Sequence, residues 1–353
     1  MAARGIMAPM QHNHERRWHP LLNEWVILSA KTANRPWSGD KVKRSAVTVP
    51  EFDEKCYLCP GVKRASGELN PRYTKTFAFT NDFSSFSADA PETRSDDFFS
   101  RHEPAKGICR VVCFSPKHNI TLAEMQTPEI LDVIALWKEE YRRLSADKMI
   151  KNVLIFENKG ASVGTSNPHP HGQIYATGFV PEIVKQELDA QVEYRKKYNS
   201  SLLIDLVRNE LKVKDRLICR NDHFAAFIPY FARFAFETYI VPLRKVSRIV
   251  DLTSEETRSF AEIFHAMLIK FDNLYNMSFP NITMFHNAPT DNDPRNDEFV
   301  FHVEFYPPMR TPDTLKYLAG FESGGGNIIN PVMPEVAAEQ LRKAADKHSE
   351  SVR

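Results

Sequence analysis

Two histidines and a glutamine alternate along residues 167–173, which read Asn-Pro-His-Pro-His-Gly-Gln and are called the histidine motif below. In an extended stretch alternate side chains share one face, so His169, His171 and Gln173 can meet the same ligand. A neutral imidazole is nucleophilic near neutral pH and can carry a phosphoryl group covalently. The motif therefore predicts a nucleotide-transfer site. These residue types leave one alternative open, a metal-binding site that takes no part in catalysis.

Cys56 and Cys59 are separated by two residues, a spacing that lets both thiolates bind one tetrahedral zinc ion. A redox dithiol is the alternative, but no thioredoxin-like strand and helix surround the pair. The chain has five cysteines, an odd number that favours a reducing compartment over a disulfide scaffold. Cys109 and Cys113 lie in an apolar run and are expected to be packed in the core.

The composition is that of an ordinary folded protein. With 353 residues, the chain is long enough for two or three domains or for one duplicated fold. Its net charge of +1 and its lack of a long basic block disfavour a nucleic-acid partner. Residues 1–15 lack the apolar core of a secretion signal, and no later stretch approaches a membrane span. These features predict a cytoplasmic protein with no membrane partner.

The stretch before the histidine motif reads as strand, helix, strand. The strand-like run 110–114, which is apolar from position 111 on, predicts a strand that ends before Pro116. Thr127 is expected to cap the following helix, with Pro128 at its first position. Apolar residues recur in that helix at positions 130, 133, 134, 137, 141 and 144. A second strand, 152–156, then leads into the histidine motif.

The same plan returns further along the chain. A strand at 238–241 ends at Pro242, a capping box of Thr253 and Glu256 begins a helix, and a strand at 281–285 follows. Pro116 and Pro242 are 126 positions apart, and so are Thr127 and Thr253. The repeat matches His171 to His302, Gln173 to Glu304 and Glu157 to His286.

We therefore predict an α+β fold of two related halves, residues 1–183 and 184–353, with mostly antiparallel sheets and flanking helices. The boundary is expected within the charged, helix-like stretch 184–198. The polar tail, 342–353, is expected to fray.

Several motifs together carry a family resemblance. Glu157-Asn158-Lys159-Gly160, Gly164-Thr165-Ser166, the histidine motif and the paired cysteines resemble galactose-1-phosphate uridylyltransferase, a branch of the histidine-triad superfamily. The resemblance extends from Arg17 to Glu322 and implies duplicated histidine-triad-like halves. Hydrolase branches carry a third histidine where this chain has Gln173, so the substitution points to a transferase.

The resemblance also implies a reaction. His171 attacks the α-phosphorus of UDP-glucose, releases glucose 1-phosphate and holds UMP until galactose 1-phosphate accepts it, with Gln173 stabilising the phosphoryl group. The kinetics should be ping-pong. A related adenylyltransferase or ADP-glucose phosphorylase using the same histidine is the first alternative. A zinc-containing nucleotide-binding protein without turnover is the second.

Two metal sites follow from the resemblance. His118 and His169 are expected to complete a zinc site with the paired cysteines; four protein ligands leave no open position, so this zinc would only hold the active-site strand. A second site, for zinc or iron, is expected in the second half. The family has three histidines and one carboxylate there, so Glu304 is a departure, and a hydrogen-bonded cluster without metal is an equal alternative. The residues of this second site are Glu187, His286, His302 and Glu304.

The resemblance further assigns substrate contacts, although a turn or a surface side chain would look the same in sequence. Asn81, Asp82 and Phe83 are expected at the nucleoside, and Arg35 at a phosphate, because a guanidinium makes paired hydrogen bonds to phosphate oxygens. The residues expected to flank the nucleophile are Asn158, Gly164 and Ser166.

The hexose phosphate is expected to contact Lys316, Phe321 and Glu322 of a partner subunit, which implies a homodimer with shared active sites. Three positions depart from the better-known uridylyltransferases. Thr32 replaces a second arginine, Thr165 replaces a cysteine, and Phe321 replaces a tyrosine. The sugar preference is therefore the least determined property.

Overall fold

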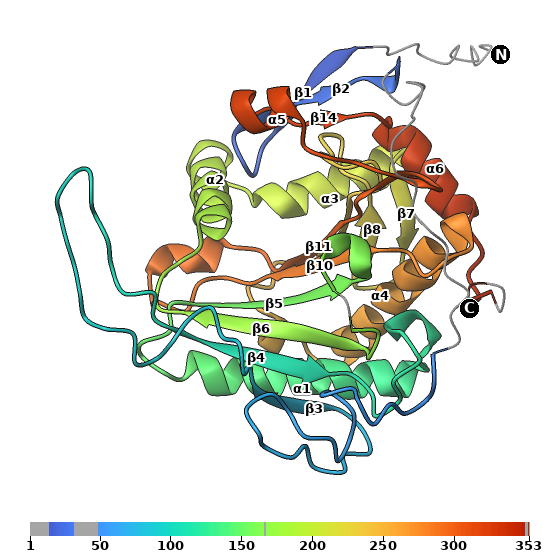
Figure 1. The fold of residues 1–353 in the computed structure, drawn as a ribbon. Coiled ribbons are helices and arrows are strands. Elements are labelled where there is room, and N and C mark those ends of the chain that lie inside the picture. The colour runs from blue at the N-terminus through green and yellow to red at the C-terminus, as the bar shows by residue number, and fades with distance from the viewer. Residues whose placement is uncertain (1–13, 32–48, 166, 350–351, 353) are drawn as a thin grey trace, which may run out of the picture.

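The computed structural model describes residues 14–31, 49–165, 167–349 and 352 (Figure 1). Its centre is a nine-stranded sheet in which every pair of neighbouring strands is antiparallel. In spatial order its strands are β3 (Phe77–Thr80), β4 (Gly107–Cys113), β6 (His171–Thr177), β5 (Asn152–Lys159), β10 (Asn281–His286), β11 (His302–Tyr306), β9 (Thr238–Pro242), β8 (Phe224–Phe227) and β7 (Leu217–Arg220).

The strand order is mirrored about the pair β5 and β10. On one side the order is β5, β6, β4, and on the other it is β10, β11, β9. Helix α1 (Thr127–Ser145) links β4 to β5, and α4 (Ser254–Tyr275) links β9 to β10 in the same way. The predicted duplication and the α+β class with mostly antiparallel strands are therefore confirmed. The two halves share one continuous sheet.

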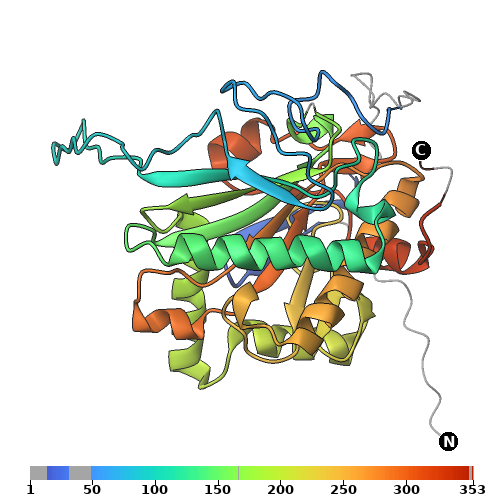
Figure 2. The ribbon, with the colours of Figure 1, turned by 90° about the horizontal axis from the view of Figure 1, so that it is seen from below.

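Both connecting helices pack on the same face of the sheet. Figure 2 shows α1 lying across the strands on this face. Trp137 of α1 and Phe264 of α4 are buried against each other and against Phe285 of β10, with the rings of Trp137 and Phe285 4.7 Å apart. Each such side chain stabilises the fold by about 1.5–3 kcal/mol. These two helices do not cover the opposite face of β5 and β6, where Leu154 packs against a cluster that includes Val184 and Leu188.

The two helix starts tested the capping predictions. The box at α4 is confirmed, since Thr253 Oγ1 accepts the Glu256 N–H at 3.2 Å and Glu256 Oε2 accepts the Thr253 N–H at 2.8 Å. At α1 the prediction was wrong by one residue, because Gln126 is the cap and Thr127 is already helical. The backbone N–H of Gln126 donates to the Glu129 carboxylate at 2.7 Å, so the hydrogen bond of the cap is made one residue before Thr127.

The remaining elements surround the large sheet. The helices are α2 (Glu182–Tyr198), α3 (Leu202–Val213), α5 (Gly320–Gly325) and α6 (Pro334–Lys343). Short 3-10 turns are η2 (Leu122–Glu124), η3 (Ala161–Val163), η4 (Ile249–Asp251) and η5 (Pro294–Glu298). Smaller strands are β1 (Glu15–His19), β2 (Glu24–Leu28), β12 (Met309–Thr311), β13 (Thr314–Leu315) and β14 (Ile329–Asn330).

Among the strands of the described residues, β14 and β2 pair in parallel. Among the described residues, no helix has the length and apolar character needed to span a bilayer.

The segment 344–349, within the tail that was predicted to fray, is bound to the rest of the molecule instead. Residues 344–349 run along α4 and are hydrogen-bonded to Lys270 and Asn273. The polar side chains of this segment find polar partners on the helix, which a sequence pattern of exposed polar residues does not reveal.

Candidate active site

His171 is the first residue of β6, and its ring orientation is fixed by the backbone. Its Nδ1 lies 2.7 Å from the carbonyl oxygen of His169, so this nitrogen carries the proton and donates. The lone pair then sits on Nε2. Burial lowers the pKa of His171, outweighing the opposing effect of that hydrogen bond. The imidazole is therefore neutral near neutral pH, the form that can act as a nucleophile.

Gln173 lies two residues further along β6 and faces the same way as His171. Its Oε1 accepts a hydrogen bond from Asn81 Nδ2 at 3.4 Å. The amide orientation is thereby set, and its N–H groups can donate to a ligand on this face. Gly172 between them packs on the opposite face, where a Cβ would come within 2.7 Å of the Phe114 ring. Only glycine lets the strand keep this position.

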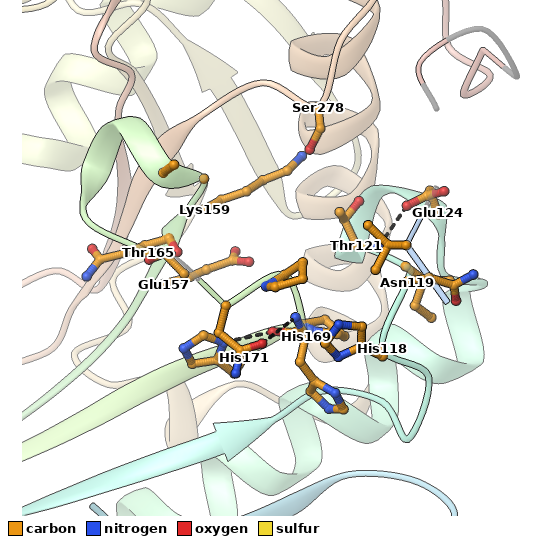
Figure 3. A pocket seen from close by; sticks show the side chains of 18 of the residues that line it. His118, Asn119, Thr121, Glu124, Glu157, Lys159, Thr165, His169, His171 and Ser278 are labelled. Carbon is orange, nitrogen blue, oxygen red and sulfur yellow. Dashed lines mark hydrogen bonds between the residues drawn. The ribbon is translucent and has the colours of Figure 1, made fainter. Parts of the chain in front are cut away.

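A cavity of about 740 Å³ opens beside the histidine motif (Figure 3). His118, His169 and His171 lie along one side of it. Glu157 and Lys159 reach into it from the end of β5, with Lys159 pointing toward Ser278 beyond α4. The site thus joins the end of the sheet to the helical face.

Cys56, Cys59, His118 and His169, here called the thiol cluster, are all buried, and their ligand atoms lie within 4.8 Å of one another. Cys59 Sγ is 3.6 Å from Nδ1 of each imidazole. Two thiols and two imidazoles around one point are the donor set of a closed tetrahedral zinc site, so these residues fit that metal.

Outer contacts hold the thiol cluster in a ligand-like orientation. His169 Nε2 lies 3.0 Å from both the Ser115 carbonyl oxygen and the Tyr73 hydroxyl, so its Nδ1 faces the sulfurs. Asn167 Nδ2 is 3.4 Å from Cys56 Sγ. Metal-ligating histidines are usually held in this way through the second nitrogen. Burial, with the nearby His118 and His171, lowers the pKa of His169 to about 3, so the ring is neutral as a ligand must be.

Glu187, His286, His302 and Glu304, here called the carboxylate cluster, form the second group of four buried residues, also within 4.8 Å. His286 Nδ1 is 2.9 Å from Glu187, and His302 Nε2 is 3.2 Å from Glu304. Tyr306 donates its hydroxyl to Glu304. Two carboxylates and two imidazoles are donors that suit zinc or iron(II).

The same carboxylate cluster is electrostatically balanced by itself. Burial alone would lower the pKa of His302, but the hydrogen bonds and charges of Glu187 and Glu304 raise it to about 10. Burial would raise the pKa of Glu187, and His286 and His302 hold it below its ordinary value instead. A protonated His302 between two carboxylates is a stable alternative to a bound cation.

The loop between β5 and β6 carries the residues that flank His171. Thr165 Oγ1 donates to the Asn158 carbonyl at 2.6 Å, which closes the loop on itself. Gly164 has a φ of +89°, in the left-handed region where a side chain is strained. Asn158 and Thr165 line the cavity. Ser166, and likewise Arg35 and Thr32, lie outside the described residues.

The expected nucleoside contacts occupy the turn after β3. Asn81 is joined to Gln173, as described above. The Asp82 carboxylate accepts the Ser66 N–H at 3.1 Å and faces Arg64 at 3.4 Å, so it is anchored to a neighbouring loop. Phe83 is 77% exposed, which leaves its ring face open to a ligand.

The three expected hexose-phosphate residues are not brought to His171 within one chain. Lys316 and Glu322 form an ion pair, and Glu322 also accepts the Ile329 N–H at 2.9 Å. Phe321 is more than half exposed on α5. None of the three lines the cavity beside the histidine motif.

Several polar side chains of the cavity were not expected from the sequence. Glu157 is buried, and its Oε2 has no hydrogen-bond partner in the described part of the chain. Lys159 Nζ is 2.6 Å from Asp272 of α4. Both residues are direct neighbours of Asn158 in the run 157–160, and this position in the sequence was the signal that could have found them. Asp272 gave no such signal.

Comparison with known proteins decides the family. The model for the N-terminal domain of galactose-1-phosphate uridyl transferase matches residues 6–181, and the model for its C-terminal domain matches residues 187–353. The chain belongs to the galactose-1-phosphate uridylyltransferase family. The uridylyltransferase of Haemophilus influenzae is 41% identical over 97% of each chain. That of Saccharomyces cerevisiae is 37% identical over 94% of each.

Solved structures agree on the fold of the uridylyltransferase family. A structure titled as a uridylyltransferase has 27% identity and a TM-score of 0.75, covering 93% of this chain and 97% of that one. An ADP-glucose phosphorylase from Arabidopsis thaliana with bound ADP-glucose has 25% identity and the same TM-score, covering 94% and 99%. Fold similarity therefore does not separate the two nucleotides, whereas the 41% identity of the full-length relative favours the uridylyl branch.

Proposed function

We propose that the protein is a UDP-glucose–hexose-1-phosphate uridylyltransferase of galactose metabolism, moving UMP from UDP-glucose to galactose 1-phosphate. Family membership along the whole chain supports the activity. The observation that carries the chemistry is His171, whose Nδ1–H is held by the His169 carbonyl and whose Nε2 lone pair shares a face with the Gln173 amide.

The reaction takes place in two displacements at the α-phosphorus. His171 Nε2 forms a P–N bond while the P–O bond to glucose 1-phosphate breaks. A phosphate oxygen of galactose 1-phosphate then forms a new P–O bond while the P–N bond breaks, which frees His171. The Gln173 amide donates to a non-bridging oxygen in both steps, and Asn81 orients that amide.

We propose zinc for the thiol cluster. When bound, it supplies a structural clamp and no Lewis-acid function, because four protein ligands fill its coordination. His169 would be a ligand through Nδ1 and would position His171 through its carbonyl. For the carboxylate cluster we propose zinc or iron, with the balanced ion pairs described above as the metal-free form.

The substrate contacts are proposed from position. Asn81, Asp82 and Phe83 would hold the nucleoside, and Arg35 a phosphate. The loop residues Asn158, Gly164 and Ser166 would contact the diphosphate. UDP-sugar and hexose 1-phosphate are then the two substrates. A cytoplasmic location is consistent with the two thiols of the thiol cluster, which face imidazoles.

We also propose a homodimer with shared active sites. Lys316, Phe321 and Glu322 lie on and before α5, apart from the cavity of their own chain. A second subunit is the source from which residues of this kind can reach the hexose phosphate. Sedimentation of the protein should give twice the mass of one chain, and a monomer that is fully active would contradict this assignment.

Intact-protein mass spectrometry tests the function directly. After incubation with UDP-glucose, the protein should gain the mass of one UMP, and the His171→Gly variant should gain none. His102→Gly is the matched control, because His102 is exposed on the long segment between β3 and β4. A UMP adduct retained in the His171→Gly variant would refute the assignment.

The ADP-glucose phosphorylase is the second candidate, on the strength of its equal structural similarity. The same experiment with ADP-glucose in place of UDP-glucose separates the two. An AMP adduct that forms faster than the UMP adduct would select the adenylyl reaction.

A further inference from the structure

The C-terminal segment, residues 344–349, binds along the last turns of α4 through specific contacts. Lys270 Nζ donates to the Ala344 carbonyl at 3.0 Å and pairs with Asp346 at 2.6 Å. Asn273 Nδ2 donates to the carbonyl oxygens of Ala345 and Lys347, and its Oδ1 accepts the Ser349 N–H at 3.1 Å. The segment is therefore held at a defined register on the helix.

This register presents His348 to a buried ion pair. His348 Nε2 donates to Asp272 Oδ2 at 3.2 Å, while Asp272 Oδ1 accepts from Lys159 Nζ at 2.6 Å and from the Phe279 N–H at 2.8 Å. The Asp272 side chain is 1% exposed and that of Lys159 is 8% exposed. Each oxygen of this buried carboxylate is used, and His348 supplies the donor for one of them.

Lys159 connects this ion pair to the active site. It is the last residue of β5, so its side chain enters the helical face while that of Asn158 points to the opposite face. Gly160 follows with a φ of +96°, and Thr165 is hydrogen-bonded back to Gly160 and Asn158. Anchoring Lys159 therefore fixes the direction in which the loop leaves the strand toward His171.

We propose that the C-terminal segment is a positioning element of the transferase site, acting through His348, Asp272 and Lys159 on the loop that flanks His171. This inference rests on the proposed function. His348 touches no reacting atom; it keeps the buried carboxylate oriented toward Lys159, and Lys159 keeps the end of β5 in place. A small misplacement of groups around a reacting centre is enough to slow transfer strongly.

The test compares His348→Ala with His348→Gln in the full-length protein. The rate of UMP transfer to His171 in a single turnover should fall about tenfold in His348→Ala, with the KM for UDP-glucose within about twofold of the wild type. His348→Gln should recover most of the rate, because its amide N–H can donate to Asp272. Bound zinc should be equal in all three proteins.

Lys347→Ala is the matched control, since its side chain is exposed and only its carbonyl contacts Asn273. It should transfer UMP at the wild-type rate. Hydrogen exchange of residues 158–171 gives a readout that does not depend on activity and should become faster in His348→Ala alone.

A wild-type rate in His348→Ala, or a His348→Gln variant as slow as His348→Ala, would overturn the inference. If the wild-type protein takes no UMP, the proposed function fails. Unchanged hydrogen exchange in His348→Ala would then overturn the positioning role as well.

Discussion

The histidines that begin β6 and β11 occupy matching places in the two halves of the sheet. His171 Nδ1 donates to the carbonyl of the residue two positions before it, at 2.7 Å, and His302 Nδ1 does the same at 2.9 Å. The difference lies two positions after each histidine. Gln173 offers a neutral amide in the first half, whereas Glu304 in the second half lies 3.2 Å from His302 Nε2.

One backbone arrangement thus supports two chemistries. In the first half, Nε2 of a neutral ring lies beside a cavity and can attack phosphorus. In the second half, the ring is completely buried and its Nε2 faces carboxylates, so it is a metal ligand or a protonated partner. We propose that the residue two positions after the histidine decides whether the ring serves as a nucleophile or as a buried cation.

The largest expected effect comes from making the first half resemble the second. Gln173→Glu should lower kcat roughly 10²- to 10³-fold, because a carboxylate repels the phosphoryl oxygens and favours a protonated His171. Steady-state kinetics with UDP-glucose and galactose 1-phosphate measure the loss. Gln173→Met, neutral and of similar length, is the companion variant. A Gln173→Glu enzyme that is faster than Gln173→Met would break the comparison.

Removing a thiol should distinguish the two clusters by their metal content. Cys59→Ser should lose the zinc of the thiol cluster and several kcal/mol of stability, since structural zinc sites contribute directly to folding. Elemental analysis and chemical denaturation measure both quantities. Cys219→Ser, which changes a thiol outside both clusters, should keep its full zinc content. Equal zinc in the two variants would show that the thiol cluster is not the zinc site.

The carboxylate cluster should be sensitive to charge balance. Glu304→Gln leaves the buried His302 with one carboxylate fewer and should destabilise the protein by about 3 kcal/mol in urea at pH 7. Glu304→His, which gives three histidines, should instead require added zinc or iron for its stability. If Glu304→Gln unfolds at the same urea concentration as the wild type, the ion pairs contribute nothing.

Glu157 should give an effect that is visible only when the pH is varied. The predicted match of Glu157 to His286 was wrong by one position. Phe156 pairs with Gln173 as Met284 pairs with Glu304, so Asn158 stands at the place of His286. Burial raises the pKa of Glu157 to about 7, with Lys159 opposing and Asp272 adding to the shift. The folded protein therefore keeps a proton that the unfolded chain releases near pH 4.5. The stability contribution of Glu157 is present below pH 4.5 and is lost as the pH rises to about 7.

Glu157→Gln should consequently gain stability relative to the wild type as the pH rises from 5 to 8, by about 3 kcal/mol at most. Urea denaturation at both pH values measures the difference. The exposed carboxylate of Glu139 on α1 provides the control variant, Glu139→Gln. A difference between Glu157→Gln and wild type that shrinks with rising pH would contradict the buried, protonated carboxyl.

Local patterns predicted the parts of the molecule that depend on neighbouring residues. The capping box at Thr253 and the alternation of His171 and Gln173 act within a few residues, and the structure has both. His169 was expected on the same face, but it lies before β6 and turns toward the thiol cluster. The grouping of His118 with the cysteines followed from the family resemblance and was not available from spacing alone. Periodicity could not supply it.

Contacts between distant segments were beyond the sequence. Lys159 and Asp272 are 113 positions apart, and either could be an exposed charge in its own element. The C-terminal segment has the composition of a frayed end, and only the facing side chains of α4 make it ordered. Which residue pairs with a charged side chain depends on which helix packs over which strand, and this is a property of the whole fold.

The antiparallel pairing of β5 with β10 has a consequence for how such a chain can arise. Two copies of a half-length chain, joined edge to edge along these strands, would give the same seam and two equivalent sites. Covalent fusion of the copies releases one of those sites from the need to turn over substrate. Such a released site could hold charged side chains in its interior, and the second half of this molecule buries two carboxylates and two imidazoles there.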